Sequence, residues 1–171
     1  VGLSDIAGAA ANTTHHAFRW TAAAGMVDLG APAGPTRISS ALDVSGNGQA
    51  IVGEAEFVDA VQLTGIRRGA FRWTAAGGFQ NLGAIEPGYF TRANATSTDG
   101  SVVVGERGIE VRVGNSSTNG SRAFRWTQGG GLVVLGPLPG HRFAAAPNVS
   151  DDGAVVVGTS SSDAASVAFR W

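Results

Sequence analysis

The sequence contains neither cysteine nor lysine. Without cysteine, the chain can form no disulfide bond and no thiolate-ligated zinc site. Without lysine, arginine supplies all 12 basic residues other than histidine, and a net charge of −1 leaves no large basic field for a nucleic-acid backbone. No uncharged apolar run approaches the roughly 18 residues of a membrane-spanning helix. We therefore expect neither nucleic acid as a partner nor insertion into a membrane.

No segment shows the periodic spacing of apolar residues that is typical of a helix. The sequence also shows no signal peptide and no initiating methionine. The chain begins at Val1, which we interpret as a sequence that is mature, processed or excised from something longer. An apolar content of 43% and a charged content of 15% are sufficient for a buried core and argue against disorder. The 26 glycines fit many short strands joined by tight turns.

Internal repetition is the dominant feature of the sequence. The tripeptide Phe-Arg-Trp ends at Trp20, Trp73, Trp126 and Trp171, at intervals of 53, 53 and 45 residues. The pair Leu-Gly begins at Leu29, Leu82 and Leu135, and the pair Val-Gly begins at Val1, Val52, Val104 and Val157. Three independent markers with nearly one period argue against coincidence.

Each repeat contains four candidate strands. In the first full repeat they cover Ala17–Thr21, Met26–Leu29, Ser40–Val44 and Gln49–Val52. The alternation of side chains along a strand places Phe18 and Trp20 on one face and Arg19 on the other. Asn-Gly or Asp-Gly joins the third and fourth candidates, which is the strongest short signal for a hairpin. We predict an all-β fold of antiparallel four-stranded repeats of about 52 residues, similar to β-propeller blades.

We treat residues 1–171 as a single repeat domain. It divides into a partial repeat at 1–16, repeats at 17–69, 70–122 and 123–167, and the start of a further repeat at 168–171. Because a propeller closes with at least about four blades, three explanations stay open: a fragment of a longer propeller, blades shared between chains, or an open array. An open array exposes strand edges, which promote association. We therefore expect the two ends to contact a partner, through Val1, Gly2, Phe169, Arg170 and Trp171.

The repeat resembles the HAF repeat of bacterial extracellular proteins. The residues that carry the resemblance are His16–Trp20, Val27–Gly30, Ser45–Gly48 and Val52–Gly53. Later repeats depart from the pattern, with Gly69, Arg122 and Val167 in place of the histidine and Asn81 and Val134 in place of Asp28. The resemblance covers nearly the whole chain. It implies a propeller-like fold, a location outside the cell or on the bacterial cell surface, and adhesin-like or autotransporter-like proteins, and it implies no catalytic residues.

The repeated aromatic and leucine side chains are interpreted as the core between blades, since each buries a large apolar area. These core candidates are Phe18, Trp20, Leu29, Phe71, Trp73, Leu82, Phe124, Trp126, Leu135, Phe169 and Trp171. A carbohydrate-binding groove is the alternative for the aromatics. The arginines of the same strands lie on the opposite face: Arg19, Arg72, Arg125 and Arg170. We expect them to pair with carboxylates such as Glu54 and Glu106 rather than to form a ring of anion-binding sites.

No set of residues indicates a metal, a cofactor or catalysis. His15 and His16 are adjacent, so in a strand they point to opposite faces and make a poor metal site. Asp99, Asp151 and Asp152 lack the spacing of a calcium-binding loop and fit hairpin turns. The sequence has no Gly-x-Ser-x-Gly elbow and no phosphate-binding loop. Scattered carboxylates leave a glycosidase-like activity as a distant alternative.

The segments that precede each Phe-Arg-Trp strand differ most in length and character. They cover Leu3–His15, Glu54–Gly69, Glu106–Arg122 and Thr159–Val167, with strand-like runs at Glu56–Leu63 and Ile109–Val113. Function on a rigid scaffold tends to lie in such loops. We expect any binding surface there, and next in the loops Pro32–Arg37, Glu86–Arg92 and Pro137–Phe143.

The sequence therefore predicts a non-catalytic extracellular repeat domain with a structural or adhesive role. We expect it to assemble with other copies, or with the rest of a longer chain, into a surface structure or filament. The alternative is a lectin-like propeller that binds a surface glycan or another ligand, and a glycan-active enzyme is a distant third.

Overall fold

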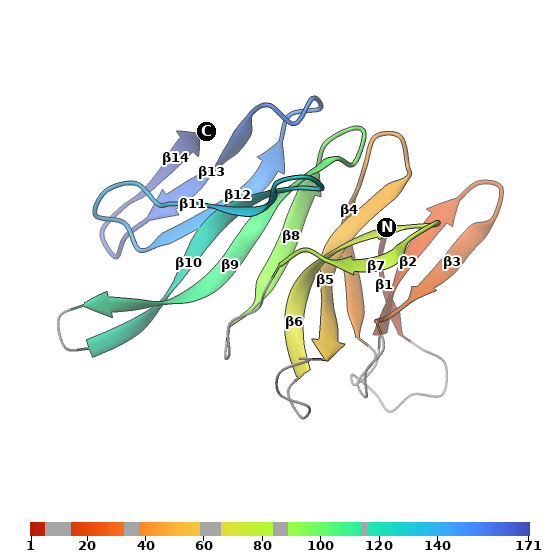
Figure 1. Ribbon diagram of the computed structural model, residues 1–171, viewed down its shortest axis with the longest axis horizontal. Coiled ribbons are helices and arrows are strands. Elements are labelled where there is room, and N and C mark those ends of the chain that lie inside the picture. The colour runs from red at the N-terminus through yellow and green to blue at the C-terminus, as the bar shows by residue number, and fades with distance from the viewer. Residues whose placement is uncertain (6–14, 33–37, 59–65, 84–88, 114–115) are drawn as a thin grey trace.

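The computed structural model describes residues 1–5, 15–32, 38–58, 66–83, 89–113 and 116–171. Within these ranges, 14 strands form four antiparallel sheets, which follow one another in chain order from one end of the molecule to the other (Figure 1). No helix capable of crossing a membrane is found in the same ranges. The predicted all-β antiparallel fold is therefore confirmed.

Every sheet is a meander in which strands that are neighbours in sequence are also neighbours in space. Sheet 1 contains β1 (Gly2–Asp5), β2 (His15–Thr21) and β3 (Gly25–Gly30). Sheet 2 contains β4 (Ser39–Val44), β5 (Ala50–Val58), β6 (Ile66–Thr74) and β7 (Gly78–Asn81). Sheet 3 contains β8 (Thr91–Thr96), β9 (Val102–Val113), β10 (Ser116–Thr127) and β11 (Gly131–Leu135). Sheet 4 contains β12 (Phe143–Val149), β13 (Val156–Ser161) and β14 (Ser166–Arg170).

The sheets are out of phase with the predicted repeats by half a unit. In sheet 2, β4 and β5 are the third and fourth strands of one predicted repeat, whereas β6 and β7 are the first and second strands of the next. The cause is that the segment before Phe-Arg-Trp forms a hairpin inside a sheet, so that β9 pairs with β10 over all of its residues. The loop that follows Leu-Gly is the one that carries the chain to the next sheet.

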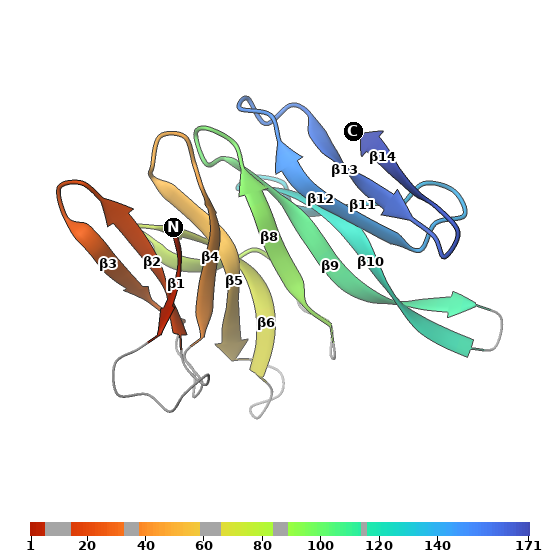
Figure 2. The ribbon, with the colours of Figure 1, turned by 180° about the vertical axis from the view of Figure 1, so that it is seen from behind.

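The four sheets pack face to face in a row, which both views of the ribbon show (Figures 1 and 2). An apolar core fills each of the three interfaces. The first strand of each later sheet contacts the sheet before it: β4 contacts β1 and β2, β8 contacts β4, β5 and β6, and β12 contacts β8, β9 and β10. Among the described strands the row has two ends and does not close on itself.

The Val-Gly marker is explained by a close approach of two strands. A Cβ atom added at Gly105 would lie 1.9 Å from the carbonyl oxygen of Arg92 and 2.9 Å from the Phe124 ring. Gly53 and Gly158 face a carbonyl oxygen in the same way, at 1.9 and 2.1 Å. Each of these carbonyls lies next to an irregularity in the pairing between the first two strands of its sheet. Glycine is therefore required wherever a bulged neighbouring strand presses against the Val-Gly strand.

The Ser-x-Asp-Gly marker forms the predicted hairpin turn. In the turn between β8 and β9, the Ser97 hydroxyl donates a hydrogen bond to Asp99 Oδ1 at 2.7 Å, and the Ser101 amide donates to the same oxygen at 2.9 Å. The Val102 amide donates to Ser97 Oγ at 3.0 Å. Gly100 has a φ of +72°, which L-residues with a side chain rarely adopt. The turn is thus fixed by its own side chains.

The same turns also join successive sheets through their backbones. The Asn47 amide donates to the Thr98 carbonyl at 3.0 Å, and the Thr98 amide donates to the Asp151 carbonyl at 3.0 Å. These bonds run from sheet 2 to sheet 3 and from sheet 3 to sheet 4. Sheets 2, 3 and 4 are therefore aligned with one another by backbone hydrogen bonds between their turns as well as by their apolar faces.

Candidate functional site

The repeated aromatic side chains of sheets 2 and 3 are buried or half-buried, whereas Trp20 and Trp171 of the two outer sheets are exposed. Phe71 and Phe124 are completely buried, and Trp126 is only 4% exposed. Trp73 packs at the margin of the core between sheets 1 and 2. Trp20 is 61% exposed, because no sheet covers its face of sheet 1 in the described part of the chain. The core prediction is therefore wrong for Trp20.

The remaining core candidates differ in their burial, and Phe18 of sheet 1 is half-buried. Leu82 and Leu135 are buried, and Leu29 packs against the core between sheets 1 and 2. Phe169 is half-buried against the core between sheets 3 and 4. Trp171 lies at the rim of that interface and is 53% exposed, so it is a second correction to the predicted core.

The repeated arginines cross from one sheet to the turn of the next. Arg72 Nε donates to the Gly100 carbonyl at 2.8 Å, and Arg125 Nη2 donates to the Gly153 carbonyl at 3.2 Å. The guanidinium of Arg125 also lies over the Trp171 ring, 5.9 Å from its centroid. The expected pairing of Arg72 and Arg125 with glutamates is therefore wrong: their face packs on the following sheet, and the turn carbonyls are the acceptors within reach.

Glu54 instead pairs with arginines outside the Phe-Arg-Trp marker. Arg92 reaches it with two nitrogens, Nε at 3.3 Å and Nη2 at 3.4 Å, and Arg68 Nη1 lies at 4.0 Å. These side chains, with Phe90 and Glu106, line a cavity of about 300 Å³. Burial raises the pKa of Glu106, against the opposing effect of nearby Arg92. The cavity thus combines carboxylates, guanidinium groups and an aromatic ring.

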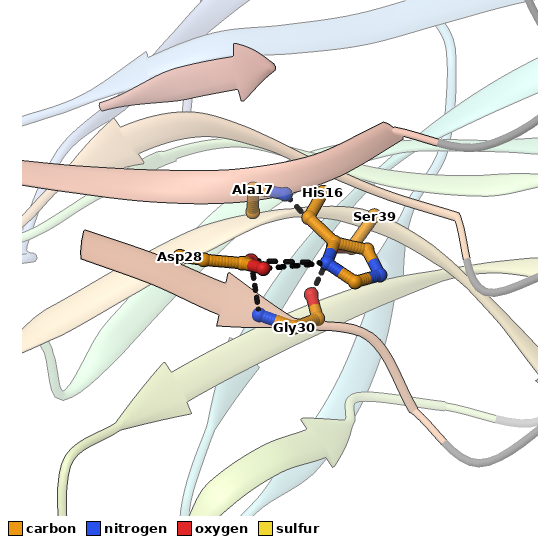
Figure 3. Close-up of polar contacts among 5 residues, drawn as sticks. All are labelled: His16, Ala17, Asp28, Gly30 and Ser39. Carbon is orange, nitrogen blue, oxygen red and sulfur yellow. Dashed lines mark hydrogen bonds and ion pairs between the residues drawn. The ribbon is translucent and has the colours of Figure 1, made fainter. Parts of the chain in front are cut away.

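Serine, histidine and aspartate side chains come together where sheet 2 meets sheet 1 (Figure 3). His16 Nδ1 lies 2.9 Å from Asp28 Oδ2, and Asp28 also accepts a hydrogen bond from the Gly30 amide at 2.7 Å. Desolvation opposes ionisation of Asp28, but its bonds to His16 and Gly30 prevail and lower its pKa. Ser39 from β4 accepts a hydrogen bond from the Ala17 amide and donates its proton to the Gly30 carbonyl.

This arrangement is a joint between two sheets rather than the geometry of an activated nucleophile. The hydroxyl proton of Ser39 is directed at a backbone carbonyl, whereas a catalytic serine directs it at the imidazole. The two residues that carry the HAF resemblance at these positions, His16 and Asp28, bridge β2 and β3. Asn81, the counterpart of Asp28 in sheet 2, retains the bond to the following glycine, since its Oδ1 accepts from the Gly83 amide at 3.2 Å.

Two of the three aspartates that we assigned to turns, Asp99 and Asp152, accept hydrogen bonds from their own turns. The pKa of Asp99 is lowered to about 2, chiefly by the hydrogen bond from the Ser101 amide and then by the Ser97 hydroxyl. The pKa of Asp152 is also lowered, by the Ser150 hydroxyl and then by the Ala154 amide. No group of three or more histidine, aspartate or glutamate residues that could hold a metal ion occurs in the described ranges.

The predicted assembly ends lie on different faces from one another. Phe169 and Trp171 face sheet 3, whereas Arg170 points outward from sheet 4 together with Val157. Val1 and Gly2 lie at the free edge of sheet 1, beside β2.

Two other exposed residues of the end faces, Met26 and Val157, were not among the residues that we predicted from the sequence to contact a partner. The signal was present, because each aligns by the repeat period with a buried or half-buried residue of sheets 2 and 3.

The variable segments favoured as binding loops lie partly outside the described residues. This is the case for most of Leu3–His15 and Pro32–Arg37, for residues 59–65 and 84–88, and for residues 114–115. The described parts of Glu54–Gly69 and Glu106–Arg122 belong to the paired strands of the hairpins β5–β6 and β9–β10. Pro137–Phe143 joins sheets 3 and 4, where His141 Nδ1 lies 3.0 Å from Ser160 Oγ.

Comparison with known proteins found no match to this chain among family models, curated proteins or solved structures.

Proposed function

We propose that this chain is a non-catalytic, extracellular repeat domain with a structural or adhesive role. Its sheets act as propeller-like blades, and it assembles with other copies or with the rest of a longer chain into a surface structure. One observation carries the proposal: the row of sheets ends in two exposed faces built from the same residue types that are buried between sheets. Large exposed apolar patches mark interaction sites.

The blade-like arrangement is supported by the way in which the sheets contact each other. Every later sheet approaches its predecessor most closely through its first strand, so that β8 contacts three strands of sheet 2. Blades that radiate from an axis meet in this way at their innermost strands. The extracellular location rests on the resemblance of the repeat markers to HAF repeats, and labelling of intact and lysed cells with an antibody against the chain tests it.

Association is tested by measuring the mass of the purified chain in solution over a concentration series. The proposal predicts that the mass rises with concentration above that of one 17.3 kDa chain. At about 100 µM, self-association with a free energy of about 5.5 kcal/mol or stronger is detectable, so a folded chain that stays monomeric up to that concentration would contradict self-assembly.

A second candidate, ligand or carbohydrate binding, is favoured by the cavity between sheets 2 and 3. Phe90 offers an exposed ring beside hydrogen-bonding groups of Glu54 and Arg92, which is the combination that sugar-binding sites use. A glycan array probed with the wild-type chain and with the Phe90→Ala variant tests it. Binding that depends on Phe90 supports this function, and an array without any signal contradicts it.

A further inference from the structure

The three internal interfaces are built alike, each from two different kinds of sheet face. One sheet offers small and aliphatic side chains from its Val-Gly and Phe-Arg-Trp strands, and we call this the receiving face. In sheet 2 it consists of Val52, Ala70 and Arg72, which lie on one side by strand register. The next sheet offers the phenylalanine and tryptophan of its Phe-Arg-Trp strand and an apolar residue of the following strand, which we call the inserting face. In sheet 3 it consists of Phe124, Trp126 and Leu132.

Among the described residues, two faces lack a counterpart. The inserting face of sheet 1 consists of Phe18, Trp20 and Met26, and its last two side chains are 61% and 60% exposed. The receiving face of sheet 4 consists of Val157, Ala168 and Arg170, all of which are exposed. Val157 is 43% exposed, whereas its equivalents Val52 and Val104 are completely buried. The two ends of the row therefore present the same residue types as the two halves of an internal interface.

We propose that the receiving face of sheet 4 in one copy of the chain binds the inserting face of sheet 1 in a second copy. This inference rests on the proposed self-association and specifies its geometry: copies join head to tail, with the Phe18 ring on Ala168 and the Trp20 ring against Arg170. An arginine–tryptophan contact of this kind already occurs within the chain, where the Arg125 guanidinium lies 5.9 Å from the centroid of the Trp171 ring. The new interface thus continues the internal series.

Contacts between like faces fit less well. Two receiving faces would bring Arg170 of each copy together without a counter-charge on either face, and like charges in contact repel. Two inserting faces would oppose bulky side chains with no small residue such as Ala168 to accept a ring. A head-to-tail contact is heterologous, so copies joined in this way form either a closed ring or an open chain.

The new interface is smaller than the internal ones. Sheet 1 has no strand equivalent to β4 among the described residues, and sheet 4 has none that supplies an equivalent of Leu82. We therefore expect reversible association with a dissociation constant on the order of micromolar rather than a permanent dimer.

Complementary single variants test the geometry. Trp20→Arg removes an aromatic ring from the inserting face and places a charge opposite Arg170. Ala168→Arg puts a bulky charged side chain on the receiving face, where a ring would otherwise pack. Each variant alone is expected to stay monomeric in sedimentation velocity at concentrations where the wild type associates. An equimolar mixture retains one intact face of each kind, so it is expected to form a one-to-one complex that does not grow. Gln128→Arg, in an exposed turn of sheet 3, is the matched control and is expected to associate like the wild type.

Circular dichroism of each variant establishes that its sheets are intact before the masses are compared. Association of the wild type without rescue in the mixture would overturn the head-to-tail geometry and leave the proposed function standing. The same holds if Trp20→Arg alone still associates. A wild type that never associates would overturn both the head-to-tail geometry and the proposed self-association.

Discussion

At the scale of single residues, the glycine of the Val-Gly marker lies where the neighbouring backbone leaves no space for a side chain. Gly105 combines two constraints, a carbonyl of the neighbouring strand and a phenylalanine ring on the opposite strand. Its counterparts Gly53 and Gly158 meet a carbonyl at nearly the same distance. The marker recurs because the same bulge recurs, and a sequence pattern alone does not reveal that cause.

Gly105→Ala is expected to destabilise the chain by more than about 2 kcal/mol, since the added Cβ atom would displace backbone and not merely a flexible side chain. Gly136→Ala is the control, because nothing lies within 4 Å of a Cβ atom there and its φ is not positive. That variant is expected to change stability by less than about 1 kcal/mol. Urea unfolding of both variants measures the difference, and equal midpoints would contradict the explanation of the marker.

Asp99 gives the fold a dependence on acid. Its folded pKa of about 2 lies below the ordinary value of 3.8, so the unfolded chain binds more protons between these values. The stabilisation is therefore complete above the ordinary value and is lost as the pH falls towards about 2. In Asp99→Asn this part of the pH dependence is expected to disappear, as measured by urea midpoints across that range. An unchanged slope in the variant would show that the Ser97–Asp99 bond does not contribute.

At the scale of elements, the strands were predictable and their grouping was not. Strand composition and the Asn-Gly and Asp-Gly turns located every type of strand that the described residues contain. The predicted unit nevertheless began at Phe-Arg-Trp, although the sheets begin half a repeat earlier at Ser39, Thr91 and Phe143. Whether a connection stays within a sheet depends on tertiary packing, which the length and composition of the connection did not reveal.

The partners of the arginines were unpredictable for a related reason. We expected the arginines to pair with carboxylates of the same sheet, such as Glu54 for Arg72. The acceptor of Arg72 is instead the Gly100 carbonyl of the next sheet. A repeat pattern defines which face a side chain occupies but not what lies opposite that face. The cavity beside Glu54 was missed in the same way, because Arg92 comes from a different sheet.

Arg125→Ala is expected to weaken the attachment of sheet 4 by about 1–2 kcal/mol, through loss of the bond to the Gly153 carbonyl and of the contact with Trp171. Trp171 fluorescence is expected to shift to longer wavelength as the ring becomes more exposed. Arg170→Ala is the matched control from the next repeat and is expected to leave the stability of the monomer nearly unchanged, because Arg170 is exposed. A comparable loss in both variants would contradict the role of the cross-sheet contact.

At the scale of the whole molecule, the inner sheets have two neighbours and the outer sheets have one. In such one-dimensional arrays each unit is stabilised mainly by its adjacent interfaces. Sequence repetition indicated an array, but which of the equivalent tryptophans would be buried depended on where the row ends. Trp126 and Trp20 occupy equivalent positions, but a preceding sheet covers Trp126 and none among the described residues covers Trp20.

Hydrogen exchange of backbone amides is expected to follow this order. Amides of the paired strands β5–β6 and β9–β10 are expected to exchange most slowly, and those of β1 and β14 fastest, because the terminal sheets open without disrupting two cores. Measurements on dilute, monomeric chain avoid protection by a second copy. Uniform protection of all four sheets would mean that the row unfolds as one cooperative unit.

The spacing of the sheets has a consequence for how this gene can change. The later sheets start at Ser39, Thr91 and Phe143, so each start is 52 residues after the last. After an in-frame loss or duplication of one such unit, an inserting face would still pack against a receiving face. Natural variants can therefore differ in length by whole sheets while keeping the contacts between sheets, whereas a change of any other length would shift the turns out of alignment.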